Sequence, residues 1–260
     1  MIQKKYLRSL GASLTLVAMA ASTNSSADTI LGIYAGAGVW DASIDGSIGV
    51  ASDSISTGEL GIKDEQSQYF YVALEHPVPI IPNIRLQHTT LENDGYAVVE
   101  REFEFDGITY PANAPTATKL DLSQTDVTLY YEILDNWVSL DLGLTAKILD
   151  GEATILATPE GSDPVGSSVE LKGGVPMLYG MARFDLPLSG LYAGGHINYF
   201  SYDNSTISDL DIKLGWMFES VLDVGAELGY RQFKLKLEDF DDADGDVTFD
   251  GPYLNLAVHF

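Results

Sequence analysis

The last ten residues, GPYLNLAVHF (251–260), alternate two kinds of side chain up to the end of the chain. Leu254, Leu256, Val258 and Phe260 share one face of an extended strand, and the residues between them occupy the other face. Chain ends usually fray unless something holds them. A two-faced strand that ends in an aromatic residue therefore predicts a terminal strand that pairs with another part of the chain.

The same period-two alternation recurs along most of the sequence, whereas helical spacing of apolar residues does not appear over any useful length. Long and short connections between these segments largely alternate. At a rise of about 3.3 Å and a tilt of about 40°, ten residues cover roughly 25 Å, the apolar band of a transmembrane barrel. Strands of a β-sandwich are shorter, at about 5–6 residues. The predicted fold is therefore all-β, a transmembrane antiparallel β-barrel. Its expected strands are 29–40, 68–75, 83–91, 125–132, 136–147, 177–186, 191–200, 210–218, 221–231 and 251–260.

Ten strands is the predicted count, with eight or twelve as alternatives. Residues 95–124 and 148–176 are long enough to form extra hairpins, which gives twelve strands, or to extend their neighbours beyond the membrane. An open sheet edge in hydrocarbon leaves backbone groups unsatisfied, so the last strand is expected to pair with the first. Aromatic girdles are expected at both interfaces. Trp137, Trp216 and Phe218 belong to one girdle, and Trp40, Tyr199 and Tyr230 to the other.

Residues 1–27 have the composition of a secretory signal peptide. A basic start is followed by an apolar run from Leu10 to Ala21 and by small residues up to Ala27. The run is too short to span a bilayer, which takes about 20 apolar residues. Residues 28–260 are the expected barrel. Three of the 14 Lys and Arg residues precede position 28, which leaves 11 against 38 Asp and Glu, a net charge of about −27. Nucleic acid is an unsuitable partner for such a surface.

Charged residues lie at the alternate positions of the expected strands, on the face that would turn into the barrel. Mixed charges in a narrow space should pair, because an unpaired buried charge is costly. Barrels of about eight strands are filled by side chains, whereas open channels appear at about sixteen. We therefore expect a mostly plugged lumen. The lumen charges are Glu75, Arg85, Asp126, Glu132, Asp141, Lys147, Arg183, Asp185, Asp211, Lys213, Asp223, Glu227 and Arg231.

An acidic stretch, DFDDADGDVTFD (239–250), invites a calcium interpretation. With Gly245 at the sixth loop position, however, the first is Phe240 and the twelfth is Gly251, so the helix-loop-helix pattern fails. An acidic outer loop is the simpler interpretation. A looser divalent site, shared with lipopolysaccharide phosphates, is the alternative, with Asp241, Asp242, Asp244 and Asp246 as weak metal candidates.

Catalytic machinery is not predicted. His196 and Asn198 share the inward face, but Ser201 lies on the opposite face, and no Gly-x-Ser-x-Gly turn exists. The acid and histidine pairs of omptin-type proteases cannot be matched to a distinctive motif. We expect no enzymatic activity and no cofactor; a membrane hydrolase or protease is the alternative.

Several stretches resemble a family of small proteobacterial outer-membrane β-barrel proteins. They are EHPVPIIPNIRL (75–86), LDLSQTDVTLYYEILDNWVSLDLGL (120–144) and GGHINYF (194–200). The final strand looks like the assembly signal of Gram-negative outer-membrane proteins, carried here by Tyr253, Leu254, Leu256, Val258 and Phe260. The resemblance implies location in the cell outer membrane and barrel architecture, and no particular chemistry.

The expected function is a structural or surface-interaction role for a monomeric barrel. Its expected partners are outer-membrane lipid, lipopolysaccharide and, during biogenesis, the barrel-assembly machinery. The alternative is a porin-like narrow channel or transporter for small or hydrophobic molecules. Gly32, Gly36 and Gly38 motivate it, because these glycines would leave a groove along the inner face of the first strand.

Overall fold

The computed structural model describes residues 31–49, 54–240 and 243–260, with the backbone alone for 238–240, 243 and 244. The predicted signal peptide at 1–27, and with it the boundary at residue 28, lies outside the described residues, as do Asp241 and Asp242. Among the described residues, no helix is long and apolar enough to cross a membrane.

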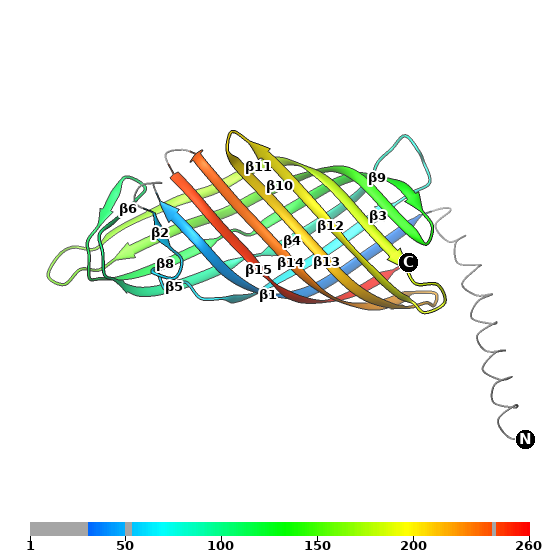
Figure 1. Ribbon diagram of the computed structural model, residues 1–260, viewed down its shortest axis with the longest axis horizontal. Helices are drawn as coiled ribbons and strands as arrows, with labels where there is room; N and C mark the ends of the chain where they lie inside the picture. The colour runs from blue at the N-terminus through cyan, green and yellow to red at the C-terminus, as the bar shows by residue number, and fades with distance from the viewer. Residues whose placement is uncertain (1–30, 50–53, 241–242) are drawn as a thin grey trace, which may run out of the picture.

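The described secondary structure consists of β-strands (Figure 1). The strands are β1 (Gly32–Gly49), β2 (Ile55–Ser56), β3 (Glu65–Glu75), β4 (Asn83–Thr90), β5 (Glu92–Val99), β6 (Phe103–Phe105), β7 (Ile108–Tyr110), β8 (Ala114–Asp121), β9 (Gln124–Asp135), β10 (Val138–Ala157), β11 (Val165–Asp185), β12 (Leu191–Tyr202), β13 (Ser205–Phe218), β14 (Asp223–Phe240) and β15 (Ala243–His259).

Ten of these strands form a closed antiparallel barrel, in the order β1-β3-β4-β9-β10-β11-β12-β13-β14-β15. The last strand pairs with the first, from Tyr34 opposite His259 onward. Beyond that pair, Ile33 and Phe260 exchange two backbone hydrogen bonds of 2.8 and 2.9 Å. The sequence-based prediction of ten strands with a closing C-terminal strand is therefore confirmed. Closure leaves no barrel strand with a free edge along the central band.

The barrel has two different ends. The C-terminus and the connections β3–β4, β9–β10, β11–β12 and β13–β14 lie at one end, here called the turn end, on the right in Figure 1. The other end, the loop end, carries the long connections β1–β3 and β4–β9 and also the two-residue turn between β12 and β13. There β10 and β11 run on together as far as the Ala157–Val165 pair, and β8 pairs with the extended part of β10. Residues 95–124 and 148–176 thus lengthen the wall and add a small hairpin inside it, and they do not add barrel strands.

The outer face of the barrel is apolar around its central band. Successive outward positions carry Leu142 and Leu144 on β10, Ile212 and Leu214 on β13, and Leu256 on β15, and these side chains are 50–67% exposed. The exposed aromatic residues at the ends of the band are Trp137, Trp216, Phe218, Tyr199 and Tyr230. Large apolar side chains left in contact with the surroundings on every strand need a nonpolar environment.

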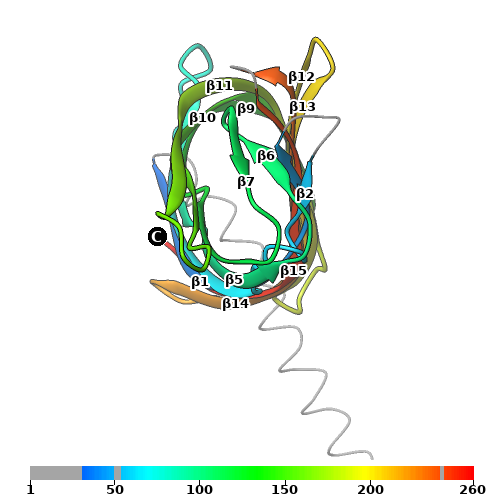
Figure 2. The same ribbon diagram turned by 90° about the vertical axis from the view of Figure 1, so that its left-hand side faces the viewer.

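At the loop end, the interior is apolar. We call it the loop-end core. Its fully buried side chains come from the inward faces of the barrel strands and from two inserted elements, β2 with the turn that follows it and the β6–β7 hairpin. They include Ile55, Leu60, Leu91, Phe103, Tyr110, Leu122, Ile155, Phe233 and Phe249. Seen along the barrel axis, β6 and β7 lie within the ring of barrel strands (Figure 2). This inserted hairpin is the plug of the loop end.

The plug is fastened to the barrel by polar contacts as well as by burial. The Tyr110 hydroxyl donates to the Ile155 carbonyl at 3.4 Å. Arg101, just before β6, donates from Nε to Glu59 Oε1 at 2.8 Å and from Nη2 to the Ser54 carbonyl at 2.6 Å. The Arg101–Glu59 pair therefore joins the plug to the segment after β2.

The Arg101–Glu59 pair should make the stability of the protein depend on pH in the acid range. The hydrogen bond from Arg101 holds the pKa of Glu59 at about 2, below the ordinary 4.5. A depressed carboxylate pKa stabilises the folded state above the ordinary value, and that contribution disappears as pH falls through the folded value. We expect the difference in free energy of unfolding between the wild type and Glu59→Gln to be constant above about pH 4.5. It should shrink between pH 4.5 and about 2.

The measurement is urea unfolding of the refolded protein at several pH values, with Glu100→Gln, an exposed acid nearby, as the control. If the difference in free energy of unfolding between the wild type and Glu59→Gln stays the same down to pH 2, the Arg101–Glu59 pair does not stabilise the plug as expected.

The closure of β15 onto β1 predicts a second outcome. A side chain at Gly251 would collide with the backbone carbonyl of Asp41 on β1, whereas one at Gly245 on the same strand would meet nothing within 4 Å. We expect Gly251→Val to lower the free energy of unfolding by about 1–3 kcal/mol. Gly245→Ala should leave it nearly unchanged. Equal stability of both variants in urea unfolding would show that close approach at Gly251 is unimportant.

Candidate functional site

The lumen is the candidate site, because it gathers the chemistry-bearing side chains of the barrel. The thirteen charged residues named from the sequence lie on barrel strands at positions of the inner face. Asp126, Asp141, Lys147, Asp211, Glu227 and Arg231 are buried, and the remainder are partly exposed, mostly toward the turn end. The arrangement forms successive groups along the axis.

The group nearest the loop end centres on Asp209, and we call it the Asp209 cluster. Lys147 Nζ lies 2.9 Å from Asp126 and 3.0 Å from Asp209, and its side chain is fully buried. Arg231 donates to both carboxylate oxygens of Asp209, from Nε at 2.8 Å and from Nη2 at 2.7 Å. Its Nη1 donates to Thr89 Oγ1 at 3.1 Å. Two cations and two carboxylates thus neutralise one another across the lumen.

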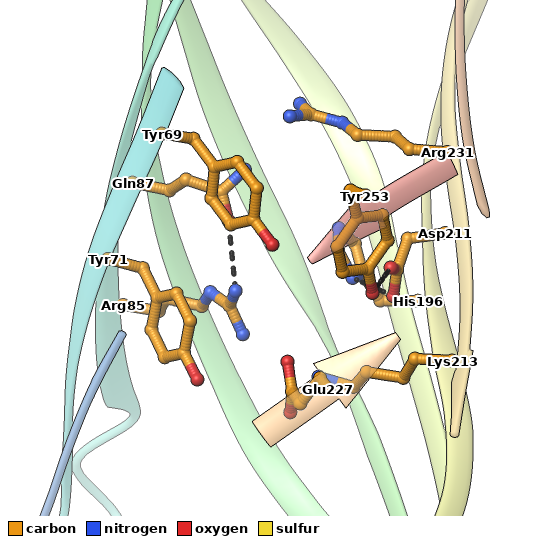
Figure 3. Close-up of a pocket in the computed structure, with 10 residues that line it drawn as sticks. All are labelled: Tyr69, Tyr71, Arg85, Gln87, His196, Asp211, Lys213, Glu227, Arg231 and Tyr253. Carbon is orange, nitrogen blue, oxygen red and sulfur yellow. Dashed lines mark hydrogen bonds and ion pairs between the residues drawn. The ribbon is translucent and has the colours of Figure 1, made fainter. Parts of the chain in front are cut away.

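A second group lies next to it, and Figure 3 shows its residues facing one another across the lumen. His196 Nδ1 is 3.1 Å from Asp211, whose carboxylate also accepts the Tyr253 hydroxyl. Lys213 Nζ is 2.9 Å from Glu227. Glu227 also accepts the Tyr192 hydroxyl at 2.6 Å and the Asn255 amide at 2.9 Å.

On the opposite wall, Arg85 donates to Gln87 at 2.9 Å and lies over the Tyr71 ring at 4.1 Å. The space between the two walls is an internal cavity of about 20 Å³. Such a volume holds about one water molecule. The cavity therefore has room for a bridging water between the charged groups and no room for a larger solute.

The turn end carries further pairs that are more exposed. Arg183 and Asp185 are 2.7 Å apart, and His259 lies 3.3 Å from Asp223. The other acids here also accept hydrogen bonds: Glu75 from the Tyr130 hydroxyl at 2.7 Å and Glu132 from the Asn83 amide at 3.2 Å. Asp141 is buried, and its Oδ1 has no hydrogen-bond partner among the described atoms.

Two expectations about the first strand are wrong. The inward glycines leave no groove, because the Tyr71 ring occupies the space beside Gly36 and the Tyr69 ring the space beside Gly38. Trp40 belongs to no girdle. It is completely buried and donates from its indole nitrogen to the Gly251 carbonyl at 3.2 Å, since its position has inward parity on β1.

Sequence reasoning missed the central acid of the lumen. Asp209 stands one residue before the expected strand 210–218, but β13 begins at Ser205. The alternation pattern could have found Asp209, because it lies at an alternate position in line with the inward residues Asp211 and Lys213. The loop-end core was also missed. Its apolar residues occupy the inward positions of strands that continue beyond the expected ends, as Phe233 does on β14.

The metal and catalytic candidates named from the sequence lie in different parts of the fold. No group of three or more His, Asp or Glu side chains in that part of the chain is arranged to hold a metal ion. Asp246 pairs with Lys234 at 3.1 Å, and the side chain of Asp244 is not among those described. Asn198 accepts from Thr145 at 2.6 Å, and Ser201 contacts Thr206 at 3.2 Å on the outer face, away from His196.

Comparison with known proteins finds structural similarity at low sequence identity and no family match. Neither the family models nor the curated proteins that were compared include a match. The outer membrane protease OmpT from Escherichia coli is 10% identical over 88% of this chain and 95% of its own, with a TM-score of 0.47. The translocator domain of autotransporter NalP from Neisseria meningitidis is 10% identical over 99% and 96%, with a TM-score of 0.45. The toluene transporter TodX from P. putida is 10% identical over 88% and 89%, with a TM-score of 0.29.

The Asp209 cluster predicts a large stability effect. Asp209→Asn removes the carboxylate that Lys147 and Arg231 share and leaves excess positive charge in a buried space. Breaking such a network by removing one partner costs about 3–5 kcal/mol. Glu170→Gln, which removes an exposed partner of Lys172, should cost no more than about 1 kcal/mol. Urea unfolding of both variants in the same lipid or detergent is the measurement, and a similar cost for both would contradict the proposed weight of the cluster.

Proposed function

We propose that this chain is a non-enzymatic, monomeric barrel of the Gram-negative outer membrane. In this proposal the lumen is closed and the function is a structural or surface-interaction role. The observation that carries the proposal is that paired buried charges and an apolar core occupy the lumen. The turn end with the C-terminus faces the periplasm, and the loop end faces outward.

The outer face supports the membrane placement. Exposed Leu, Ile and Val side chains on every barrel strand would aggregate in water, whereas lipid acyl chains match them. The closed ring satisfies the backbone groups that hydrocarbon cannot. The C-terminal strand ends in exposed Phe260 beside β1, as a strand handed to the barrel-assembly machinery would. Lipid and lipopolysaccharide are the proposed surroundings.

The interior supports a closed lumen through two separate barriers. The Asp209 cluster spans the lumen with buried ion pairs, and the cavity beside it is about 20 Å³. Between this cluster and the loop end, the loop-end core closes the barrel with side chains such as Phe103 and Phe233, both completely buried. A solute would have to displace both layers. A narrow channel is therefore the less favoured function, and the glycine groove that motivated it is filled.

Electrical recording tests the closed lumen. Single-channel recording of the refolded protein in a planar bilayer should show no steady conductance comparable with that of general porins. Removal of the plug by replacing residues 102–111 with a short Gly-Ser linker should leave the bilayer unconductive, because the Asp209 cluster remains. The same plug deletion combined with Lys147→Ala and Arg231→Ala should produce measurable current, since both barriers are then weakened.

Steady wild-type conductance, or swelling of protein-containing liposomes in small solutes, would overturn the closed-lumen proposal in favour of the channel. Heat-dependent migration on a gel verifies that each variant is folded before recording. Turnover of a panel of lipids and peptides that is lost in His196→Ala would instead favour an enzyme.

A further inference from the structure

The internal cavity of the lumen is bordered by hydroxyl groups that have no hydrogen-bond partner. Tyr69 and Tyr71 are 8% and 7% exposed, and both line the cavity. Among the described residues, neither hydroxyl donates a hydrogen bond, and the contacts of both side chains are made by their rings. Figure 3 shows the Tyr69 hydroxyl and the Arg85 guanidinium directed from one wall toward the space between the walls.

Arg85 differs from the other cations of the lumen, because its polar contact is with a neutral group. From Nη2 it donates to Gln87 Oε1 at 2.9 Å, and the guanidinium lies over the Tyr71 ring at 4.1 Å. A guanidinium has five N–H donors, so most of those of Arg85 have no acceptor. The other lumen cations lie 2.7–3.0 Å from carboxylate oxygens, and they are Lys147, Arg183, Lys213 and Arg231.

The carboxylates that line the cavity are engaged on their own wall, which β12 to β15 form. Glu227 accepts hydrogen bonds there at 2.6 and 2.9 Å. Asp211 Oδ1 lies 3.1 Å from a histidine nitrogen and is itself buried, so it does not open onto the cavity. On the facing wall, Gln87 accepts with its amide oxygen, which leaves its amide nitrogen as a further donor. The cavity therefore offers more free donors than free acceptors.

This imbalance favours an anion over a water molecule. A buried water molecule donates hydrogen bonds as well as accepting them, whereas an anion only accepts. An anion could take N–H groups of Arg85 and both hydroxyl protons together, and it would give the guanidinium the negative partner that it lacks. The cavity measures about 20 Å³, the size of one water molecule, which admits a monatomic ion and excludes polyatomic anions.

We propose that the lumen cavity binds one chloride ion, held by the Arg85 guanidinium and by the hydroxyl groups of Tyr69 and Tyr71. β3 supplies the two tyrosines, and the neighbouring strand β4 supplies Arg85 and Gln87. The ion fills the space between this wall and the β12–β15 wall and completes the charge pairing of the lumen. Chloride binding is a property beyond the proposed structural or surface-interaction role and does not depend on it.

Anomalous X-ray scattering locates the ion directly. The full-length chain is refolded in detergent with bromide as the halide and crystallised, and diffraction is recorded at the bromine absorption edge. We expect an anomalous peak in the cavity, between Arg85 and the two tyrosine hydroxyls. Water alone in the cavity, or bromide only on the outside of the barrel, would overturn the proposal.

Halide binding should also stabilise the barrel. A ligand that binds only the folded state raises the folding equilibrium constant by the factor 1 + [L]/Kd. Above Kd, the constant should therefore rise about tenfold for each tenfold increase in chloride concentration. Urea unfolding between about 10 mM and 1 M chloride is the measurement. Gluconate, which is too large for the cavity, holds the ionic strength constant. A folding constant that is independent of chloride over this range contradicts the site.

A matched pair of arginine variants separates the site from a general salt effect. Arg85 and Arg183 both lie over tyrosine rings, at 4.1 and 3.8 Å, but Arg183 is paired with Asp185 at 2.7 Å and does not line the cavity. The chloride dependence should be lost in Arg85→Met and retained in Arg183→Met. Equal chloride dependence in both variants would show that the ion acts elsewhere.

Tyrosine variants test the hydroxyl groups while keeping the rings. Tyr69→Phe combined with Tyr71→Phe should weaken chloride binding by at least about tenfold. Tyr130→Phe should change it less than about twofold, because that hydroxyl is bonded to Glu75 and lies outside the cavity lining. Heat-shifted gel mobility verifies that each variant is folded. Where a variant does not fold, the bromide map of the wild type decides.

Discussion

Closure of the sheet by hydrogen bonds between β15 and β1 is the constraint on which the structure depends. Once these strands pair, from Tyr34 opposite His259 upward, every barrel strand has two neighbours along the central band. Each side chain must then face either into the ring or out of it. The leucines of alternate positions form the outer face, and charged residues of the other positions are confined inside the ring.

Confinement explains the character of the lumen. A lysine as fully buried as Lys147 needs anionic partners, and it has carboxylates at 2.9 and 3.0 Å on two other strands. Those contacts tie β9, β10, β13 and β14 across the barrel. The same ion pairs that fill the space therefore hold opposite walls together, whereas the tyrosines over glycines pack between the neighbouring strands β1 and β3.

Toward the loop end the interior changes from ion pairs to apolar side chains. Inward residues such as Ile155 and Phe233 can be buried only against something placed inside the ring. The β6–β7 hairpin and the segment after β2 supply that material. Because β12 and β13 stop earlier than their neighbours, this small core is covered on most sides and half-exposed along β11. The unequal lengths of neighbouring hairpins therefore decide how completely the strands around the loop-end core cover it.

The sequence by itself determined the local properties of the chain. Period-two alternation, strand lengths and the aromatic C-terminal strand were enough to predict the ten-stranded barrel and its closing pair, because side-chain direction alternates strictly along a strand. The alternation of side-chain direction also determined which charges share a face. It places Trp40 on the inner face of the first strand, and it places Asp209 there as well once the strand is known to begin at Ser205. Tertiary structure alone decided which charges meet, since Lys147, Asp209 and Arg231 come from three strands whose register across the barrel no local pattern encodes. It also decided that a hairpin from the 91–123 connection folds inward as a plug, because this depends on how far neighbouring strands extend past one another.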